Sequence, residues 1–248
     1  MYDKSLSIFS PEGTLSQVEY ALEAVKHGGL SIGVTGTKCI ILAAERKAVP
    51  KLQDQRTIRK INKIDKHISM AFAGIVADSR SLSDYARLES QSFRYSLDTT
   101  PTVDYIAKQV AFRKQDYTQR SGVRPFGLSC LIAGFDEGSE IPKLYMTDPS
   151  GQVTMWKSAA IGKNADKVIG LLENGYKENM TQNECLVLAI ESMLQYVEAG
   201  SKNMEIAVMT PGQLMQVLPD EKVDELIKGI EEKKKNEEKS NIIMNKNQ

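Results

Sequence analysis

The side chains that most often carry catalysis or bind metals are few and widely separated in this sequence. It contains two histidines, His27 and His67, and three cysteines, Cys39, Cys130 and Cys185. The cysteines fit neither a disulfide framework nor a CxxC metal site. The phosphate-binding, hydrolase and zincin signatures GxGxxG, GxxxxGK[ST], GxSxG and HExxH are all missing. Residue types and spacing alone therefore predict no catalytic centre, no metal site and no cofactor.

The isolated histidines and cysteines have simple structural interpretations. His27 stands before a Gly-Gly pair that ends a predicted helix. A positively charged side chain at this end is stabilised by the negative end of the helix dipole. His67, in the sequence Asp65-Lys66-His67, is expected to lie in a solvated turn. The three cysteines occupy apolar runs, so we expect buried structural thiols rather than nucleophiles.

The composition is that of an ordinary globular protein. Of the 248 residues, 41% are hydrophobic and 26% are charged, and 32 basic residues balance 32 acidic ones. This balance argues against nucleic-acid or anionic-membrane partners. No apolar run reaches membrane-spanning length, and the N-terminus resembles no signal peptide. An odd number of scattered cysteines favours a reducing compartment, the cytosol or nucleus.

The stretch from Phe9 to Ala21 must be positioned by a turn followed directly by a helix. Pro11 fixes φ at the start of the turn, and Gly13 tolerates the φ that closes it. Ser16-Gln17-Val18-Glu19 fits a capping box, so we expect Ser16 to cap the helix. Apolar residues then recur on one helix face until Gly28-Gly29 ends it.

The remaining pattern places pairs of helices between blocks of strands. Strands are expected over 30–34, 39–45, 68–74, 126–135, 144–147, 152–156, 206–209 and 214–218, with hairpins joining the first two and the last two. Helices are expected from Asp78, which can cap the helix, to about Leu97, from Pro101 through Ala111, over 165–176, over 181–197 with a capping box from Thr181 to Glu184, and after Pro219. Such an order favours antiparallel sheets, and two stacked sheets between two helical layers would bury every apolar face. The fold class predicted is α+β, a four-layer αββα sandwich.

The domain organisation follows from where the apolar pattern starts and stops. Residues 1–10 form a polar N-terminal tail, and residues 11–232 form one domain. Residues 233–248 are mostly Lys, Glu and Asn, and we expect this charged tail to be disordered.

Several blocks of the chain, in order and correctly spaced, resemble the α-type subunits of the 20S proteasome. The blocks are Tyr2-Asp3-Lys4, Phe9–Ala21, Ala73–Arg80, Gly122–Gly127, Asp148–Gly151 and Ala160–Gly162. Two further segments, 51–57 and 200–206, resemble the subunit that occupies the fourth position of the α ring. The resemblance covers essentially the whole length, and it implies the αββα sandwich of N-terminal-nucleophile hydrolases.

The resemblance also implies that no residue is catalytic. In the catalytic β-type relatives a processed N-terminal threonine is activated by an acidic residue and a lysine. Those positions match Gly29, Glu45 and Lys60 here, so the nucleophile is replaced by an internal glycine. Ser31 lies close by, but an internal serine lacks the terminal amine that serves as base. The alternative is an active N-terminal-nucleophile peptidase on the same fold.

What the resemblance implies instead is a structural and gating subunit. Seven α subunits form a ring on the β rings, and the tails ahead of the Pro11 turn converge over the axial pore. The gate positions match Tyr2, Asp3, Lys4, Pro11 and Tyr20. The family usually has Arg at position 4, and Lys cannot make the same bidentate pair with a carboxylate.

The implied partners are other α subunits, β-ring subunits and regulatory particles, in ubiquitin-dependent degradation in cytoplasm and nucleus. Lys60 matches the pocket lysine that meets the C-terminal carboxylate of a regulatory particle. The alternative for Lys60 is an exposed lysine in a basic loop beside Arg59 and Lys63. The alternative for the whole chain is a generic monomeric binding module.

Overall fold

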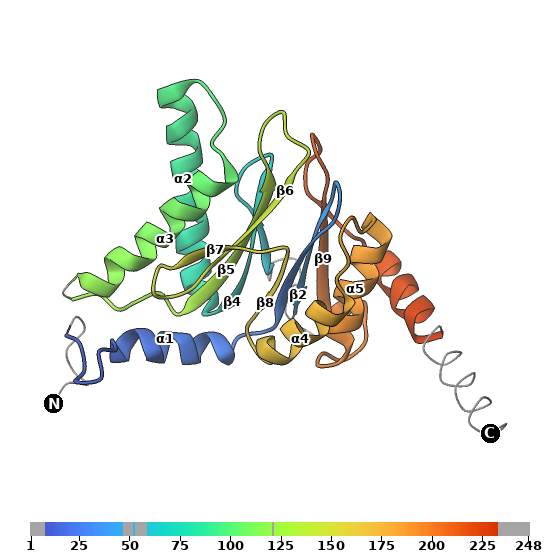
Figure 1. The fold of residues 1–248 in the computed structure, drawn as a ribbon, viewed down its shortest axis with the longest axis horizontal. Coiled ribbons are helices and arrows are strands. Elements are labelled where there is room, and N and C mark those ends of the chain that lie inside the picture. The colour runs from blue at the N-terminus through green and yellow to red at the C-terminus, as the bar shows by residue number, and fades with distance from the viewer. Residues whose placement is uncertain (1–7, 47–51, 53–58, 121, 233–248) are drawn as a thin grey trace.

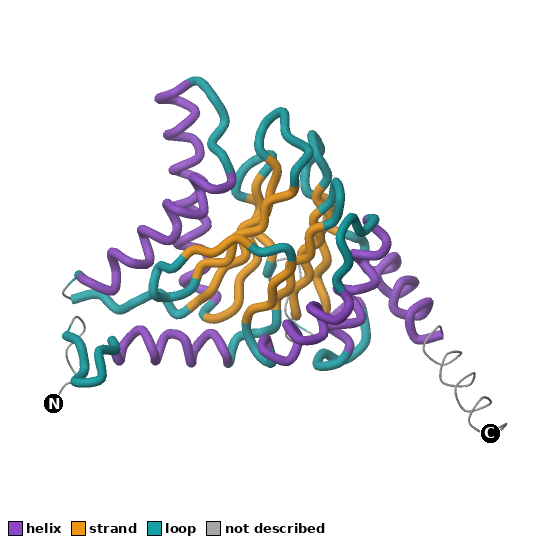
Figure 2. The backbone as a smooth tube through the Cα atoms, viewed as in Figure 1, coloured by secondary structure: helices purple, strands orange, loops and turns teal. Residues whose placement is uncertain are grey.

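Two five-stranded antiparallel sheets lie face to face between layers of helices (Figures 1 and 2). The structure is a computed structural model, and it describes residues 8–46, 52, 59–120 and 122–232. The predicted αββα sandwich is therefore confirmed. Within the described residues, none of the helices is both long and apolar enough to cross a membrane.

Each sheet is assembled from strands that are distant in sequence. Sheet A has the order β10-β9-β2-β1-β8 and sheet B the order β3-β4-β5-β6-β7. The strands of sheet A are β1 Ser31–Thr35, β2 Ile40–Glu45, β8 Ser158–Ile161, β9 Met204–Met209 and β10 Gln216–Val217. Those of sheet B are β3 Ile61–Lys63, β4 Ile68–Gly74, β5 Leu128–Phe135, β6 Pro142–Thr147 and β7 Val153–Met155.

The helices cover the outer faces of the two sheets in pairs. Helices α2 (Val76–Leu97) and α3 (Val103–Gln119) pack on sheet B, whereas α4 (Ala165–Gly175) and α5 (Gln182–Leu194) pack on sheet A. A helix over residues 220–232 also contributes to the sheet A side. Helix α1 (Ser16–Lys26) belongs to neither pair and runs along one end of the sandwich, where it contacts β4 and β5 (Figure 1).

The core consists of three apolar layers because the central strands are apolar on both faces. In β2, Ile41 and Ala43 face the helices on sheet A, while Ile40 and Leu42 face sheet B. All four side chains are fully buried. A period of two with no polar face is the pattern of a strand covered on both sides.

Two strands were not predicted, and both are short. β3 has three residues and β8 has four. β8 matters for the topology, because only Trp156 and Lys157 separate it from β7, yet β7 belongs to sheet B and β8 to sheet A. The predicted hairpin of β1 with β2, and that of β9 with β10, are both confirmed.

The predicted capping box at Ser16 is wrong, whereas the pattern Thr181 to Glu184 forms one. Ser16 is already the first helical residue of α1, and Leu15 occupies the cap position without a side-chain bond. In α5, Thr181 Oγ1 accepts from the Glu184 N–H, and the Glu184 carboxylate accepts from the Thr181 N–H. A capping box needs a residue with a side-chain hydroxyl directly before the first helical residue. At α1 the residue in that position is Leu15, which has no hydroxyl.

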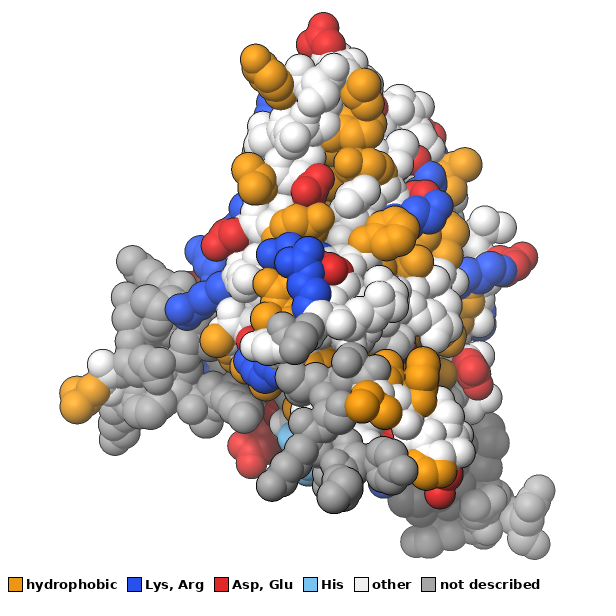
Figure 3. All heavy atoms as spheres, turned by 90° about the vertical axis from the view of Figure 1, so that its left-hand side faces the viewer, with side chains coloured by type: hydrophobic (Ala, Val, Ile, Leu, Met, Phe, Trp, Pro, Cys, Tyr) orange, Lys and Arg blue, Asp and Glu red, His pale blue; other side chains and the backbone are white. Residues whose placement is uncertain are grey.

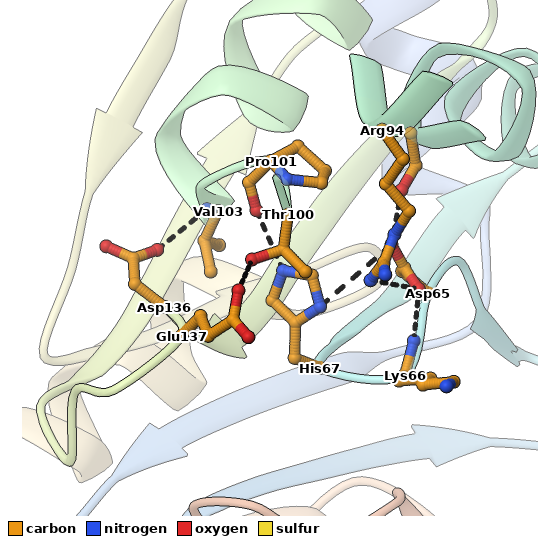
Figure 4. A network of polar contacts seen from close by, with 10 residues as sticks. Asp65, Lys66, His67, Arg94, Thr100, Pro101, Val103, Asp136 and Glu137 are labelled. Carbon is orange, nitrogen blue, oxygen red and sulfur yellow. Dashed lines mark hydrogen bonds and ion pairs between the residues drawn. The ribbon is translucent and has the colours of Figure 1, made fainter. Parts of the chain in front are cut away.

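The prediction that His67 lies in a solvated turn is also wrong. Its side chain is only 17% exposed, and its Nε2 lies 2.8 Å from the Pro101 carbonyl oxygen. Beside it, the Asp65 carboxylate accepts hydrogen bonds from Arg94 and Ser90, which tie the β3–β4 turn to α2 (Figure 4). A cavity of about 800 Å³ adjoins this network between the β5–β6 and β9–β10 turns.

Candidate functional site

The junction between α1 and β1 is built from glycines whose backbones touch. A Cβ atom on Gly28 would lie 2.2 Å from the Gly74 nitrogen, and one on Gly74 would lie 2.2 Å from the Gly127 oxygen. A Cβ on Gly162 would lie 2.6 Å from the Gly29 oxygen. Contacts this short leave no room for any side chain, so only glycine lets α1 run into β1 here.

Asp78 supports this junction from the first turn of α2. Its carboxylate accepts two hydrogen bonds from the Arg124 guanidinium, at 2.7 and 2.8 Å, and one from the Gly127 N–H at 3.0 Å. Burial acts to raise the pKa of Asp78, but these hydrogen bonds and the Arg124 charge outweigh it and lower the pKa. Asp78 does not cap α2 as predicted, because α2 begins at Val76 with Ile75 at the cap.

Gly29, the position that the resemblance matches to the catalytic nucleophile, is an internal glycine beside a carboxylate. Gly29 is buried and is preceded by α1, so it presents neither a side chain nor an α-amine. Glu45 Oε2 lies 3.3 Å from the point where a Cβ on Gly29 would stand. That oxygen accepts a hydrogen bond of 2.8 Å from the Leu30 N–H.

Ser31 and Lys60 both pack on Phe72 of β4. Ser31 is fully buried, and its hydroxyl donates to the Phe72 carbonyl oxygen at 2.9 Å. Lys60 is 4% exposed, and its Nζ lies 4.9 Å from the centre of the Phe72 ring, within the range of a cation–π contact. Its backbone N–H donates to the buried carboxylate of Glu205. The alternative interpretation of Lys60 as an exposed lysine is therefore wrong.

The predicted turn ahead of α1 is confirmed. The Gly13 N–H donates to the Ser10 carbonyl oxygen at 2.9 Å, and Gly13 has a φ of +80°. Pro11 is exposed within this turn. The Ser10 and Thr14 hydroxyls lie 2.9 Å apart and close the turn a second time. The remaining gate positions, Tyr2, Asp3 and Lys4, lie outside the described residues.

The first half of α1 contributes little to the core of this chain. Only Ala21 and Val25 of the helix are buried, and both lie in its second half. Tyr20 is 51% exposed, and Phe9, just before the turn, is 65% exposed. The neighbouring face of the molecule carries hydrophobic side chains in islands between charged ones (Figure 3). Leu88 and Phe112 of the α2–α3 pair are more than half exposed.

Comparison with known proteins matches almost the whole chain. The family model described as "Proteasome subunit" matches residues 25–209, and the model for the N-terminal signature of A-type proteasome subunits matches residues 2–24. The chain belongs to the proteasome subunit family. The N-terminal signature marks it as an α-type subunit of the 20S core, and the two matches meet in the last turn of α1.

Relatives from plants, amoebae and animals agree with this assignment. The chain is 49% identical to the alpha type-7-A proteasome subunit of Arabidopsis thaliana over 234 residues, which cover 94% of this chain and 93% of that protein. It is 47% identical to the alpha type-7 subunit of Dictyostelium discoideum over 96% of both chains. It is 45% identical to an alpha type-7-like subunit of Macaca fascicularis over 94% of both chains. The subunit at the fourth position of the α ring is called α type-7 in animals, so the predicted resemblance to that subunit is confirmed.

The structure brings together blocks that the sequence presented separately. Three of the blocks on which the resemblance was based contribute residues that contact the end of α1 or belong to the Asp78–Arg124 pair that supports it. These residues are Gly74, Asp78, Arg124, Gly127 and Gly162. Their spacing signalled a family but not a shared location. The role of Phe72 was missed altogether, because an apolar residue inside an apolar strand carries no separate signal. Among the described residues, no group of His, Cys, Asp and Glu is arranged to hold a metal ion.

We predict that Asp78→Asn lowers the free energy of unfolding near neutral pH by about 1–3 kcal/mol, because an amide cannot accept all three donors as a carboxylate does. A carboxyl whose pKa is lowered by folding adds stability above its unfolded pKa, and this stability is lost as the pH falls through the folded pKa. The variant should therefore lose less stability than the wild type on acidification below about pH 4.

Urea unfolding of the full-length chain at several pH values measures both effects. Asp84→Asn is the matched control, since Asp84 lies on the same helix, is 73% exposed and pairs with Arg87. Its effect should stay within about 0.5 kcal/mol. Equal losses in the two variants, or an unchanged acid dependence in Asp78→Asn, would contradict the supporting role of Asp78.

Proposed function

We propose that this chain is a non-catalytic structural and gating subunit in the seven-membered outer α ring of the 20S proteasome. In this role its N-terminal segment helps to control substrate access to the proteolytic chamber. The observation that supports the proposal best is the continuity of α1 with β1 through Gly28 and Gly29. An N-terminal-nucleophile enzyme needs a free α-amine at that place, and a chain that keeps α1 has none.

The exposed apolar surface supports assembly into a ring on the β subunits. Phe9 ahead of α1, Leu88 on α2 and Phe112 on α3 are each more than 60% exposed in this chain. Large exposed apolar side chains set among charged ones are typical of the mixed apolar and polar surface of protein interfaces. We further propose that the assembled particle acts in ubiquitin-dependent degradation in the cytoplasm and nucleus.

Removal of residues 1–10 is expected to raise the basal hydrolysis of small fluorogenic peptides by assembled core particles, because the obstruction ahead of the Pro11 turn would be lost. Peptide hydrolysis at saturating activator is the control, since mutant and wild-type particles should then turn over equally. An unchanged basal rate in fully assembled particles would contradict a gating role for this segment.

The competing proposal, an active peptidase on the same fold, is tested at Ser31. We predict that Ser31→Ala leaves peptide hydrolysis by particles with this chain unchanged, because the Ser31 hydroxyl is buried and donates to the Phe72 carbonyl. Turnover lost in Ser31→Ala, with assembly intact by native mass spectrometry, would support the active peptidase instead.

We also propose that Lys60 contributes to the docking of regulatory particles between α subunits. A lysine held against the Phe72 ring is a fixed point charge, which suits a terminal carboxylate presented at the edge of this chain. Only 4% of Lys60 is exposed within one chain, so a docking carboxylate reaches its Nζ only when the residues of this chain that cover it move.

Replacement of Lys60 by Ala should weaken the binding of an activator's C-terminal peptide by about tenfold, the loss expected for one hydrogen bond to a charged group. Lys63→Ala, an exposed lysine three positions further on, is the matched control and should bind normally. Equal binding by both variants, measured by fluorescence anisotropy on intact particles, would exclude Lys60 from the docking site.

A further inference from the structure

Two of the three cysteines meet in the apolar core between sheet A and the helices that cover it. Cys39 stands directly before β2, and Cys185 lies in α5, 146 positions later. Their sulfur atoms are 4.0 Å apart and share a hydrogen bond. Both thiols are free, and both are at least 97% buried. The two cysteines are distant in sequence and are brought together only by the fold. The proposed gating role does not involve them.

The backbone around the pair holds the two sulfurs in place. The Gly36 N–H donates to the Cys39 carbonyl at 2.8 Å, and the Thr37 N–H donates to the Met180 carbonyl at 3.0 Å. The β1–β2 turn is thus fixed to the residue just ahead of α5. A Cβ on Gly36 would lie 2.7 Å from each sulfur, so only glycine leaves the space that the pair occupies.

The two thiols are also electrostatically unequal. The hydrogen bond with Cys185 lowers the pKa of Cys39, against the opposing effect of burial. The same hydrogen bond, reinforced by burial, raises the pKa of Cys185. Since the thiolate is the reactive form, Cys39 is the sulfur suited to react first and Cys185 the one suited to resolve the product.

We propose that Cys39 and Cys185 are a peroxide-sensitive dithiol that forms a disulfide and thereby tethers α5 to the start of β2. Closing a bond of about 2 Å from the observed separation needs only a small movement of each side chain. A surface hollow of about 370 Å³ between α4 and α5 is lined by Met180 and Glu184, which adjoin the pair. Neither sulfur lines this hollow, so hydrogen peroxide reaches the pair from this side when the start of α5 moves locally.

The reaction is balanced with one hydrogen peroxide as the oxidant. The Cys39 thiolate attacks one peroxide oxygen, the O–O bond breaks, and Cys39 becomes a sulfenic acid while the other oxygen leaves and takes up a proton to form water. The Cys185 sulfur then attacks the Cys39 sulfur, the S–O bond breaks, and a second water leaves with the Cys185 proton. The two cysteines lose two electrons, and the peroxide gains them.

Peptide mapping of wild-type core particles treated with hydrogen peroxide tests the proposal without any variant. Free thiols are alkylated after treatment, and the expected product is a linked Cys39–Cys185 peptide that dithiothreitol reverses. Oxidation of Met155, which is 56% exposed, confirms an effective dose. Cys130 is the internal control, because it is equally buried but lies in the separate core between sheet B and its helices. It should stay a free thiol during the peroxide treatment and be recovered in its alkylated form.

Two further readouts separate a disulfide from general oxidation. In Cys185→Ser the linked peptide should vanish, and dimedone should trap Cys39 as the sulfenic acid. In wild-type particles, oxidation should slow amide hydrogen exchange over 182–194 by about tenfold, and Cys185→Ser should show no such slowing. The proposal would be overturned if Cys39 and Cys185 both stay reduced at a dose that oxidises Met155. It would also be overturned if Cys130 reacts as fast as Cys39.

Discussion

Direct contact between glycine backbones at the end of α1 is the constraint on which the rest of this structure depends. Two close contacts, of Gly28 with Gly74 and of Gly29 with Gly162, hold the segment between α1 and β1 against both sheets. Gly74 ends β4 of sheet B, and Gly162 follows β8 of sheet A. A single methyl group at Gly28 would meet the Gly74 backbone at 2.2 Å. The sandwich can therefore carry α1 across its end only while these positions have no side chains.

The same constraint supports the proposed non-catalytic role of this chain. Because α1 continues into β1, the position that would carry a nucleophile is an internal glycine. The polar residues that remain nearby contribute to the fold instead. Glu45 accepts from the Leu30 N–H, Ser31 donates to the Phe72 carbonyl, and Lys60 lies against the Phe72 ring. Phe72 of sheet B thus contacts both Ser31 and Lys60, the residue that the resemblance matches to the catalytic lysine.

Local signals were sufficient for much of this fold. The Pro11–Gly13 turn, the β1–β2 hairpin and the Thr181 capping box each depend on residues within a few positions of one another, and each was predicted correctly. The Ser16 capping box failed for a local reason, because Leu15 occupies the cap position, whereas the other failures depended on distant partners. Asp78 was expected to cap α2, but its carboxylate instead binds Arg124, 46 positions away, because that pairing supports Gly127.

The short strands and the candidate site show the same limit. β8 is recognisable only by its pairing with β1, which lies more than a hundred residues earlier. The burial of Lys60 follows from Phe72, and no pattern around Lys60 itself indicates it. The blocks around Gly74, Gly127 and Gly162 indicated a family, but their common role at the α1 junction is visible only once the chain is folded.

The intact mass of this chain, taken from purified core particles, tests the central claim most directly. If α1 is a permanent part of the subunit, the mature chain retains every residue from the N-terminal signature through Gly28, apart from ordinary modification of the first residues. A mature chain that begins at Gly29, or at any residue of β1, would contradict the claim, because it would expose a new α-amine where a catalytic relative carries its nucleophile.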